Sequence, residues 1–462
     1  MALSEEVRKT HRDLSAIDLE FRELAHEDPR FLDRSHFQPL TRENELLAYR
    51  LQPWLTFLGR DKLQELQRVS LGMYRLLQTL PMRIFEGDLN RLQEFYGFPS
   101  PFITEIVMSP PNGIDTIISR GDLIDTADGF KCIEFNFSPH LGGWESPILA
   151  GLHLSVPATA EFLSSRGIPV AYTDTVQKLF RLVIRDVMEK GISRDGEINV
   201  GFLIPTTDPV ESTGPKTRYF DGELQRALAE VGGGLSGRVV AGNYASLSTR
   251  DNLLFSGGLR LHAAIDLTIG GNTQPAVFRS FKSSNLSLFN GPVGPVLGTK
   301  RNLALLSEHA GTSAFSDEER EFIRRYIPWT RLVVPGSVEF EGRSAPLDEL
   351  LVARRERMVL KEGGSAGGKG VFLGKFTPEP EWREAIATAM QSRGQWVVQE
   401  HFESLPYLYQ SGDHGASVHD VIWGPFVFGG EYAGVILRMQ PRAAGGAVNL
   451  SLAATEGVVF EV

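Results

Sequence analysis

Residues 117–147 carry the pattern that most constrains the fold of this 462-residue chain. Two stretches with alternating polar and apolar side chains flank a turn expected at Asp128-Gly129, and this pattern predicts a β-hairpin. Successive side chains of a strand point to opposite faces. One face of the hairpin is therefore expected to carry Arg120, Asp122, Cys132, Glu134 and Asn136. The other face is expected to bury Ile133, Phe135 and Phe137 in a hydrophobic core.

The polar face of this hairpin has the composition of a metal and phosphate site. Two carboxylates and a carboxamide oxygen are the hard ligands that Mg²⁺ takes when it also binds nucleotide phosphates, so Asp122, Glu134 and Asn136 are the predicted metal ligands. A fixed guanidinium stabilises charge that develops on a transferred phosphoryl or acyl-phosphate oxygen, so Arg120 is the predicted catalytic group. An exposed hairpin with incidental charges is the alternative that this stretch alone leaves open.

A second strong signal is the segment 363–370, which has five glycines in eight residues between two predicted strands. Glycine allows backbone N–H groups to approach phosphates closely. The segment is not a P-loop, because Gly370 stands where that motif needs Ser or Thr and a strand follows instead of a helix. A plain hairpin loop would need only about two to five residues and not five glycines, so the segment favours a flexible loop that can approach phosphates; the family resemblance described below implies that it is a lid over a nucleotide. The residues expected to bind the phosphates are Lys361, Gly364, Ser365, Ala366, Gly367 and Gly368.

The Arg120-Gly-Asp122 and Glu134-Phe-Asn136 motifs resemble those of the glutathionylspermidine synthetase group of circularly permuted ATP-grasp ligases. In that family the corresponding Asp, Glu and Asn ligate Mg²⁺, and the Arg stabilises the reaction centre. The metal ligands come first in the family's chain and the phosphate-binding lysines come later. This sequence has the same order, with Lys300 and Lys361 after the hairpin.

The resemblance implies further site residues. Lys300 would contact the ATP phosphates, and Gln399 and Glu400 would hold adenine and ribose. Arg438 would act at the reaction centre, with Arg442 as the competing candidate. After the hairpin the chain departs from the family pattern, so the resemblance does not identify the acid or the amine. In this departing segment the residues expected to contact the substrates are Ser138, His140, Trp144 and Glu145.

The patterns predict an α+β protein, and the resemblance implies a circularly permuted ATP-grasp fold. The expected parts are an N-terminal helical region (1–98), a first part of the magnesium-site lobe (99–160), an inserted small parallel α/β domain (161–290), a nucleotide lobe with the glycine loop (291–402) and a second part of the magnesium-site lobe (403–462). Ser4 and Thr41 are expected to cap N-terminal helices, which would form a cap or the surface of a homodimer. Residues 260–267 and 275–281 are expected to form short strands.

The composition limits which binding partners and which cellular compartment we expect for the protein. A net charge of −10, without a cluster of basic residues, argues against nucleic acid as a partner. The single cysteine, Cys132, excludes an intramolecular disulfide framework and suits a reducing compartment, and we expect it to be a packing residue. No apolar run reaches membrane-spanning length and the N-terminus does not resemble a signal peptide, so we expect a cytoplasmic protein without membrane contact.

The function that the resemblance implies is ATP-dependent condensation of a carboxylate with an amine through an acyl phosphate, which gives an amide, ADP and phosphate. The expected cofactors are ATP and Mg²⁺. The expected substrates are small carboxylates and amines such as an amino acid, a small peptide or a polyamine. Three alternatives stay open: a phosphotransferase on the same scaffold, a nucleotide-binding regulator without turnover, and a purely structural protein.

Overall fold

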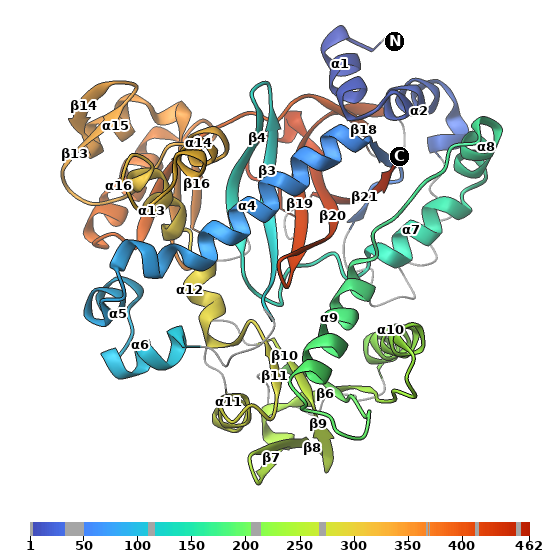
Figure 1. Cartoon of the computed structure of the whole chain (residues 1–462). Helices are drawn as coiled ribbons and strands as arrows, with labels where there is room; N and C mark the ends of the chain where they lie inside the picture. Colours follow the sequence, from blue (N-terminus) through green and yellow to red (C-terminus); the bar gives the residue numbers. More distant parts are fainter. Residues whose placement is uncertain are drawn as a thin grey trace.

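The computed structural model of the protein describes residues 3–32, 50–109, 116–204, 214–267, 274–365, 368, 370–411, 415–449 and 454–462. Its architecture is mixed α+β, as predicted. A large central sheet is accompanied by one smaller sheet beside it and another below it (Figure 1). None of the helices described over these ranges combines the length and the hydrophobicity that crossing a membrane would require.

The central sheet joins the beginning, the middle and the end of the chain. Its strand order is β1-β21-β20-β19-β3-β4, with β18 paired to β19 and β2 paired to β21. The strands are β1 (Arg50–Leu51), β2 (Thr56–Leu58), β3 (Ile118–Thr126), β4 (Gly129–Asn136), β18 (Tyr407–Gln410), β19 (Ala416–Phe428), β20 (Glu431–Pro441) and β21 (Thr455–Glu461). The two N-terminal strands run parallel to β21, and the other neighbours are antiparallel.

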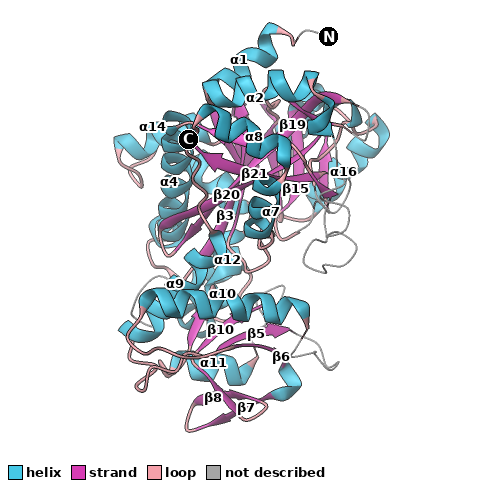
Figure 2. Cartoon of the chain, turned by 90° about the vertical axis from the view of Figure 1, so that its right-hand side faces the viewer, coloured by secondary structure: helices cyan, strands magenta, loops and turns pink. Residues whose placement is uncertain are grey.

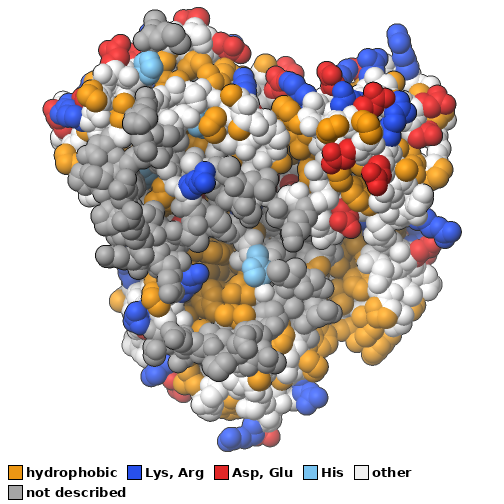
Figure 3. Space-filling view, turned by 180° about the vertical axis from the view of Figure 1, so that it is seen from behind, with side chains coloured by type: hydrophobic (Ala, Val, Ile, Leu, Met, Phe, Trp, Pro, Cys, Tyr) orange, Lys and Arg blue, Asp and Glu red, His pale blue; other side chains and the backbone are white. Residues whose placement is uncertain are grey.

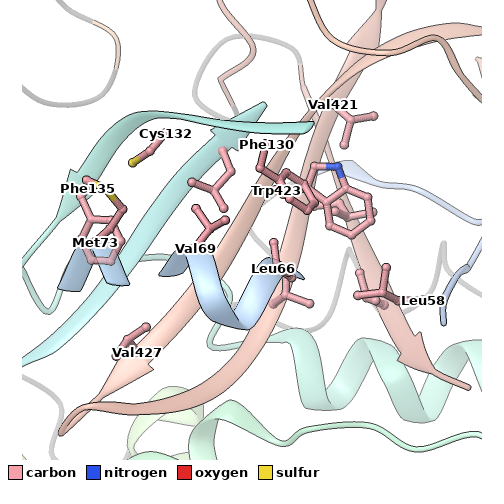
Figure 4. Close-up of a cluster of buried hydrophobic side chains, with 14 of the residues drawn as sticks. Leu58, Leu66, Val69, Met73, Phe130, Cys132, Phe135, Val421, Trp423 and Val427 are labelled. Atoms are coloured by element: carbon pink, nitrogen blue, oxygen red, sulfur yellow. The ribbon is translucent and has the colours of Figure 1, made fainter. Parts of the chain in front are cut away.

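One face of the central sheet is covered by the long helix α4 (Arg60–Phe85) (Figure 1). Its buried apolar side chains recur every three or four residues, which places them in one stripe along the helix. Figure 4 shows the cluster that this stripe forms with the sheet, in which the labelled side chains are Leu58, Leu66, Val69, Met73, Phe130, Cys132, Phe135, Val421, Trp423 and Val427. Because α4 closes this face, a ligand site on the hairpin has to lie on the other face.

The second sheet contains the strands on both sides of the glycine-rich segment. Its antiparallel order is β12-β17-β15-β16, formed by β12 (Thr330–Leu332), β15 (Met358–Glu362), β16 (Val371–Leu373) and β17 (Trp396–Glu400). The helices around it are α13 (Arg301–His309), α14 (Asp317–Tyr326), α15 (Leu347–Ala353) and α16 (Glu379–Gln391) (Figure 1). Lys361 pairs with Val371, so the glycine-rich segment 363–370 connects two antiparallel strands, as predicted.

The third sheet lies below the central sheet in Figures 1 and 2 and is entirely parallel. Its order is β11-β10-β5-β6, formed by β5 (Val200–Ile204), β6 (Val239–Asn243), β10 (Ala263–Asp266) and β11 (Ser287–Phe289). Its faces pack against α9 (Thr175–Glu189), α10 (Pro215–Val231) and α11 (Pro275–Lys282). A parallel α/β unit is thus present within 161–290, while the predicted domain boundaries stay predictions.

The prediction of a strand at residues 275–281 is wrong, because α11 covers this segment. The Gln274 side chain accepts hydrogen bonds from the first backbone N–H groups, and Pro275 stands in the first turn, where its missing N–H is not needed. Val277 and Phe281 are four residues apart and both are buried, which is helical spacing. Residues 260–267 do contain strand, in β9 (Leu259–Leu261) and β10.

The described part of the N-terminal region is helical apart from two short strands that the sequence did not predict. Ser4 caps α1 (Glu5–Leu14), as predicted, and its Oγ accepts a hydrogen bond from Val7 N at 3.3 Å. Thr41, the other predicted cap, lies outside the described residues. Strands β1 and β2 span only two and three residues, too few for an alternating pattern to show, and their partner β21 lies at the other end of the chain.

Candidate active site

The hairpin of β3 and β4 presents its four predicted site residues on one face. In the antiparallel register Arg120 faces Asn136, and Asp122 faces Glu134. Side chains that are directly opposite in such a pair lie close enough to interact. The turn lies at Ala127-Asp128, one residue before the predicted position. All four side chains line a cavity on the face of the sheet opposite α4.

A β-bulge in the hairpin interrupts the simple alternation of its side chains. Asp122 pairs with Glu134 but Leu123 pairs with Cys132, so Ile133 is an extra residue. As a result Cys132 turns into the core under α4 (Figure 4), and Ile133 lines the cavity. The prediction that Cys132 shares the face of Glu134, and that Ile133 lies in the core, is therefore wrong. Burial raises the pKa of the Cys132 thiol well above its usual range, consistent with a packing role.

Two arginines from different strands meet at Asp122. Arg120 Nε lies 3.1 Å from Asp122 Oδ1, and Arg438 Nη2 from β20 lies 2.6 Å from the same oxygen. Burial alone would raise the pKa of Asp122, but the two guanidinium groups outweigh it and lower the pKa to about 2. Arg120 also donates to the backbone carbonyl of Leu141. The carboxylate thus fixes two cations that the sequence separates by more than three hundred residues.

Arg442 occupies a different wall of the same cavity. It follows β20, and its Nε lies 2.7 Å from Asp420 Oδ1 while its Nη2 donates to the backbone carbonyl of Ser404 at 2.6 Å. Arg438 shares Asp122 with Arg120, whereas Arg442 does not contact the metal-ligand residues. Of the two arginines proposed for the reaction centre, the geometry favours Arg438.

Two lysines reach the hairpin, Lys300 from the start of α13 and Lys361 from β15 in the sheet that carries the glycine segment. Lys300 Nζ lies 3.1 Å from Glu134 Oε1 and also donates to the backbone carbonyl of Ser365. Lys361 Nζ donates to Ile133 O at 2.9 Å and to Gln399 Oε1 at 2.6 Å. Burial lowers the pKa of Lys361 to about 8, and the nearby Lys300 charge adds to this effect.

The cavity has a volume of about 390 Å³ and lies between the central sheet and the second sheet. One part of it is polar and is lined by Lys361 and by the arginines and oxygen groups already described. The rest has apolar walls from both sheets, formed by Ile124, Ile133, Val359, Val371, Leu373, Phe376, Phe402, Val421 and Ile422. Figure 3, a view from behind, shows that this side of the protein is hollowed at its centre, with hydrophobic side chains visible in the hollow. An apolar region beside a cationic region suits the base and the phosphates of a nucleotide.

The strand β17 places the two residues predicted to hold adenine and ribose at the edge of the cavity. Gln399 is buried, and its Nε2 donates to Thr330 Oγ1 at 3.2 Å while its Oε1 accepts from Lys361. Glu400 lines the cavity, but its Oε1 accepts a hydrogen bond from Arg357 Nη2 at 2.6 Å. Gln399 therefore orients a lysine, and Glu400 keeps one carboxylate oxygen for a ligand.

The glycine segment approaches the cavity at Gly368, which has φ of 77°. A Cβ at this position would lie 2.6 Å from Asn449 Nδ2, so only glycine allows this close contact with another cavity residue. Gly364 and Ser365 precede this point, and neither lines the cavity. The two other predicted phosphate-binding residues, Ala366 and Gly367, lie outside the described residues.

Of the four predicted substrate residues, one lines the cavity and three do not. His140 lines the cavity, and its Nε2 lies 2.6 Å from the backbone oxygen of Leu267. Ser138 Oγ accepts a hydrogen bond from His140 N at 3.1 Å without reaching the cavity. Trp144 stacks on Phe428 with ring centres 6.0 Å apart. Glu145 is buried away from the cavity, so among these residues only His140 reaches the space in front of the arginines.

The oxygen groups of Asp122, Glu134 and Asn136 fit a magnesium ion that also binds phosphates. In the described part of the chain, no group of three or more His, Cys, Asp and Glu side chains could hold a metal by itself. Mg²⁺ in nucleotide sites typically uses only one or two carboxylates plus phosphate and water oxygens, so this donor set is sufficient. Both carboxylates are paired with cations in the structure, and phosphate groups would compete for those cations.

Apart from Arg442, sequence reasoning missed the second polar wall of the cavity. It contains the ion pairs Arg442–Asp420 and Lys375–Glu403. No motif marks these residues, because each pair forms between segments that only the fold brings together. The apolar walls were missed for a different reason: the apolar residues of β15, β16 and β19 look like those of any buried strand.

The comparisons with known proteins agree with this architecture. No family model matches the sequence, and a search of the curated proteins finds no match. Among solved structures, a glutathione synthetase-like effector from Globodera pallida, in its apo form, superposes with a TM-score of 0.59 and 13% sequence identity. The match covers 94% of this chain and 98% of that one. At this identity the likeness shows the fold, and over almost its whole length this chain shares the fold of a glutathione synthetase-like protein.

Proposed function

We propose that this protein is an ATP-dependent carboxylate–amine ligase with a circularly permuted ATP-grasp fold. The observation that carries the proposal is that oxygen ligands and arginines on β3, β4 and β20 meet Lys361 from the second sheet in one cavity, where Glu134 is also contacted by Lys300 from the start of α13. The likeness to a glutathione synthetase-like effector supports it. The order of the chain supports the permuted arrangement, because the hairpin precedes both lysines.

The cavity has a place for each part of a nucleotide. The apolar walls around Val359 and Ile422 would enclose the base, and Lys300 and Lys361 would hold the phosphates. Asp122, Glu134 and Asn136 would hold Mg²⁺, which when bound would neutralise charge on the phosphoryl group that ATP supplies. Gly368 brings backbone close to the polar part of the cavity.

The two arginines would bind the acid and stabilise the acyl phosphate. Arg120 and Arg438 converge on one oxygen of Asp122, so their positions are fixed before a substrate arrives. Guanidinium groups that are already oriented stabilise developing oxyanion charge without reorganisation at the moment of reaction. His140, which borders the same part of the cavity, would contact the acid or the amine.

The test is ADP release measured with pairs of acids and amines in the presence of Mg²⁺ and ATP. We expect ADP release to require both partners, and mass spectrometry to find a product equal to acid plus amine minus water. Asn136→Ala should abolish this turnover, while Asn90→Ala, an exposed position on α5 (Leu89–Tyr96), should not change it. ADP release without an amine, together with a stable phosphorylated product, would instead indicate a phosphotransferase. No thermal stabilisation by Mg²⁺ and ATP would refute nucleotide binding.

A further inference from the structure

His140 lines the cavity, and the two nitrogens of its ring have different surroundings. Its Nε2 lies 2.6 Å from the backbone oxygen of Leu267, the residue that follows β10 in the third sheet. Leu267 is held in place by its backbone N–H, which donates to Leu203 O on β5 at 2.8 Å. His140 therefore contacts a carbonyl group whose position is set by the backbone of the parallel sheet.

The contact with Leu267 decides which ring nitrogen carries a hydrogen. A carbonyl oxygen can only accept a hydrogen bond, so Nε2 of His140 is the donor. In the neutral imidazole the other nitrogen, Nδ1, then has a lone pair and can accept a proton. Within the described part of the chain Nδ1 has no hydrogen-bond partner, and His140 is an exposed residue of the cavity wall. Nδ1 is thus the ring nitrogen that remains for a ligand.

The backbone next to His140 is fastened to the proposed reaction centre. Arg120 donates a hydrogen bond to the backbone carbonyl of Leu141. A Cβ on Gly142 would lie 3.7 Å from Arg120 Nη1, so the backbone here runs alongside the guanidinium. His140 therefore borders the part of the cavity in which Arg120 and Arg438 would hold the acyl phosphate.

The other titratable groups of the cavity are less suited to take a proton. Each cavity acid is paired with a cation, in the pairs Asp122 with Arg120 and Arg438, Glu134 with Lys300, Glu400 with Arg357, Glu403 with Lys375 and Asp420 with Arg442. A carboxylate beside a cation holds a proton weakly. Lys361 already donates to two acceptors. The other histidine among the described cavity residues, His401, follows β17 beside Glu400, which is predicted to hold the nucleotide.

The charged groups around His140 come from two sheets. Those of the central sheet that share this part of the cavity are Arg120, Asp122 and Arg438. On the side of Leu267 the third sheet contributes Asp266, which accepts a hydrogen bond from the Tyr244 hydroxyl at 2.7 Å. Since both aspartates are engaged by these partners, a proton that leaves a ligand here has the imidazole as its acceptor.

We propose that His140 is the general base of the amide-forming step and takes a proton from the acceptor amine at Nδ1. The proposal rests on the ligase function proposed above. A base is needed only for a nucleophile that is protonated at neutral pH, so the implied acceptor is an alkylamine, such as the amino group of an amino acid or a polyamine. Histidine is the side chain that most often acts as a general base in enzymes.

The proposed step transfers two protons from the acceptor nitrogen. The ammonium form of the acceptor gives one proton to Nδ1, which leaves a neutral amine and an imidazolium. The amine nitrogen forms the C–N bond with the acyl carbon, the bond from that carbon to the phosphate oxygen breaks, and phosphate leaves with the electron pair and takes the second proton from nitrogen. His140 then releases its proton to water and returns to the neutral form.

A change of acceptor separates a base from a structural residue. His140→Gln keeps a side-chain N–H for Leu267 O but has no basic nitrogen. With the acid and alkylamine that support turnover in the ADP-release screen, kcat of His140→Gln at pH 7 should fall about 100-fold with little change in KM, and the defect should shrink as the pH rises and more of the amine is uncharged. With hydroxylamine, which is mostly uncharged at pH 7, the rate should fall less than about threefold. His309→Gln, on α13 outside the cavity, should match the wild type with both acceptors.

The tautomer of His140 is tested without any substrate. ¹H–¹⁵N NMR spectra of the full chain with labelled histidine should show His140, identified by the loss of its signals in His140→Gln, protonated at Nε2 and not at Nδ1. A hydrogen on Nδ1 overturns the role of His140, and so does an equal loss of rate with the alkylamine and hydroxylamine, or a wild-type rate of His140→Gln with the alkylamine. If the wild type forms no hydroxamate from hydroxylamine, ATP and any acid of the screen, the ligase function itself fails and the proposal falls with it.

Discussion

The strongest prediction compares buried Lys361 with half-buried Lys62, which lie on opposite sides of the β3–β4 hairpin. Lys361 lies on the cavity side and donates to Ile133 O and Gln399 Oε1. Lys62 lies on the α4 side, where its Nζ is 2.8 Å from Asp125 Oδ1. We replace each by methionine, which keeps a similar length and removes the charge. We expect Lys361→Met to weaken nucleotide binding with little change in stability. We expect Lys62→Met to reduce stability without a change in nucleotide binding.

Lys361→Met should change stability little, because two effects offset each other. Burial lowers the pKa of Lys361 from 10.5 to about 8. At pH 7 the lysine is protonated in both the folded and the unfolded state, so the full cost of burying the charge, about 3.4 kcal/mol, is present and is relieved by methionine. The substitution also leaves the Ile133 carbonyl and the Gln399 amide oxygen without their hydrogen-bond donor, which lowers the free energy of unfolding by about 1–2 kcal/mol for each acceptor. The net change in the free energy of unfolding should lie within about 1 kcal/mol of zero.

Affinity for Mg²⁺ and ATP should fall about 30- to 100-fold, because a charge-assisted bond to phosphate contributes about 2–3 kcal/mol.

Lys62→Met should do the reverse. Asp125 is 2% exposed, and its remaining side-chain partner is the Tyr407 hydroxyl, which donates to Asp125 Oδ2 at 2.8 Å. Removing the cation from a buried ion pair costs about 3–5 kcal/mol, and the site is far from the nucleotide cavity, so ATP affinity should not change. Urea unfolding and calorimetric ATP titration measure both quantities. A loss of more than about 3 kcal/mol in Lys361→Met with unchanged ATP affinity would show that this lysine is structural and refute the reasoning.

Three further predictions test other parts of the structure. Arg438→Lys should lower turnover about 100-fold or more, while Arg442→Lys should lower it less than about tenfold, and equal rates would contradict the placement of Arg438 at the reaction centre. Burial lowers the pKa of His153 to about 3, so the imidazole stays neutral in the folded state but is protonated on unfolding below pH 6.5, and stability falls as the pH drops below that value. His153→Gln should therefore reduce the slope of unfolding free energy between pH 6 and 4 by about 1.4 kcal/mol per pH unit, and an unchanged slope in urea melts at several pH values would count against it. The Cys132 thiol should react with Ellman's reagent only as fast as the protein unfolds, and rapid reaction of the native protein would contradict its burial.

Local patterns predicted those parts of the fold whose partners are near in sequence. The hairpin of β3 and β4 has a two-residue turn, so alternation was enough to place Arg120, Asp122, Glu134 and Asn136 together. The bulge at Ile133 was not predictable in this way, because one extra residue reverses the alternation and only the packing of Cys132 under α4 decides where it occurs.

Contacts between distant segments were predictable only through the resemblance. Nothing local distinguishes Lys300 from other lysines at the start of a helix, and its contact with Glu134 depends on how two sheets are placed. The helix at residues 275–281 is a different case, since Pro275 and the spacing of Val277 and Phe281 did contain the signal.

The balance of charge in the cavity argues that the site is built for an anionic ligand and not for stability. The second polar wall is neutral, because each of its arginines and lysines has a carboxylate partner, as in Arg442–Asp420. On the other wall, Arg120, Lys361 and Arg438 line the cavity with the two carboxylates of Asp122 and Glu134, and a fourth cation, Lys300, contacts Glu134. A buried excess of positive charge is costly unless something compensates for it, and the lowered pKa of Lys361 is the visible sign of that cost. The excess of about two positive charges in this group of six side chains matches the net charge of about −2 that ATP carries together with one Mg²⁺.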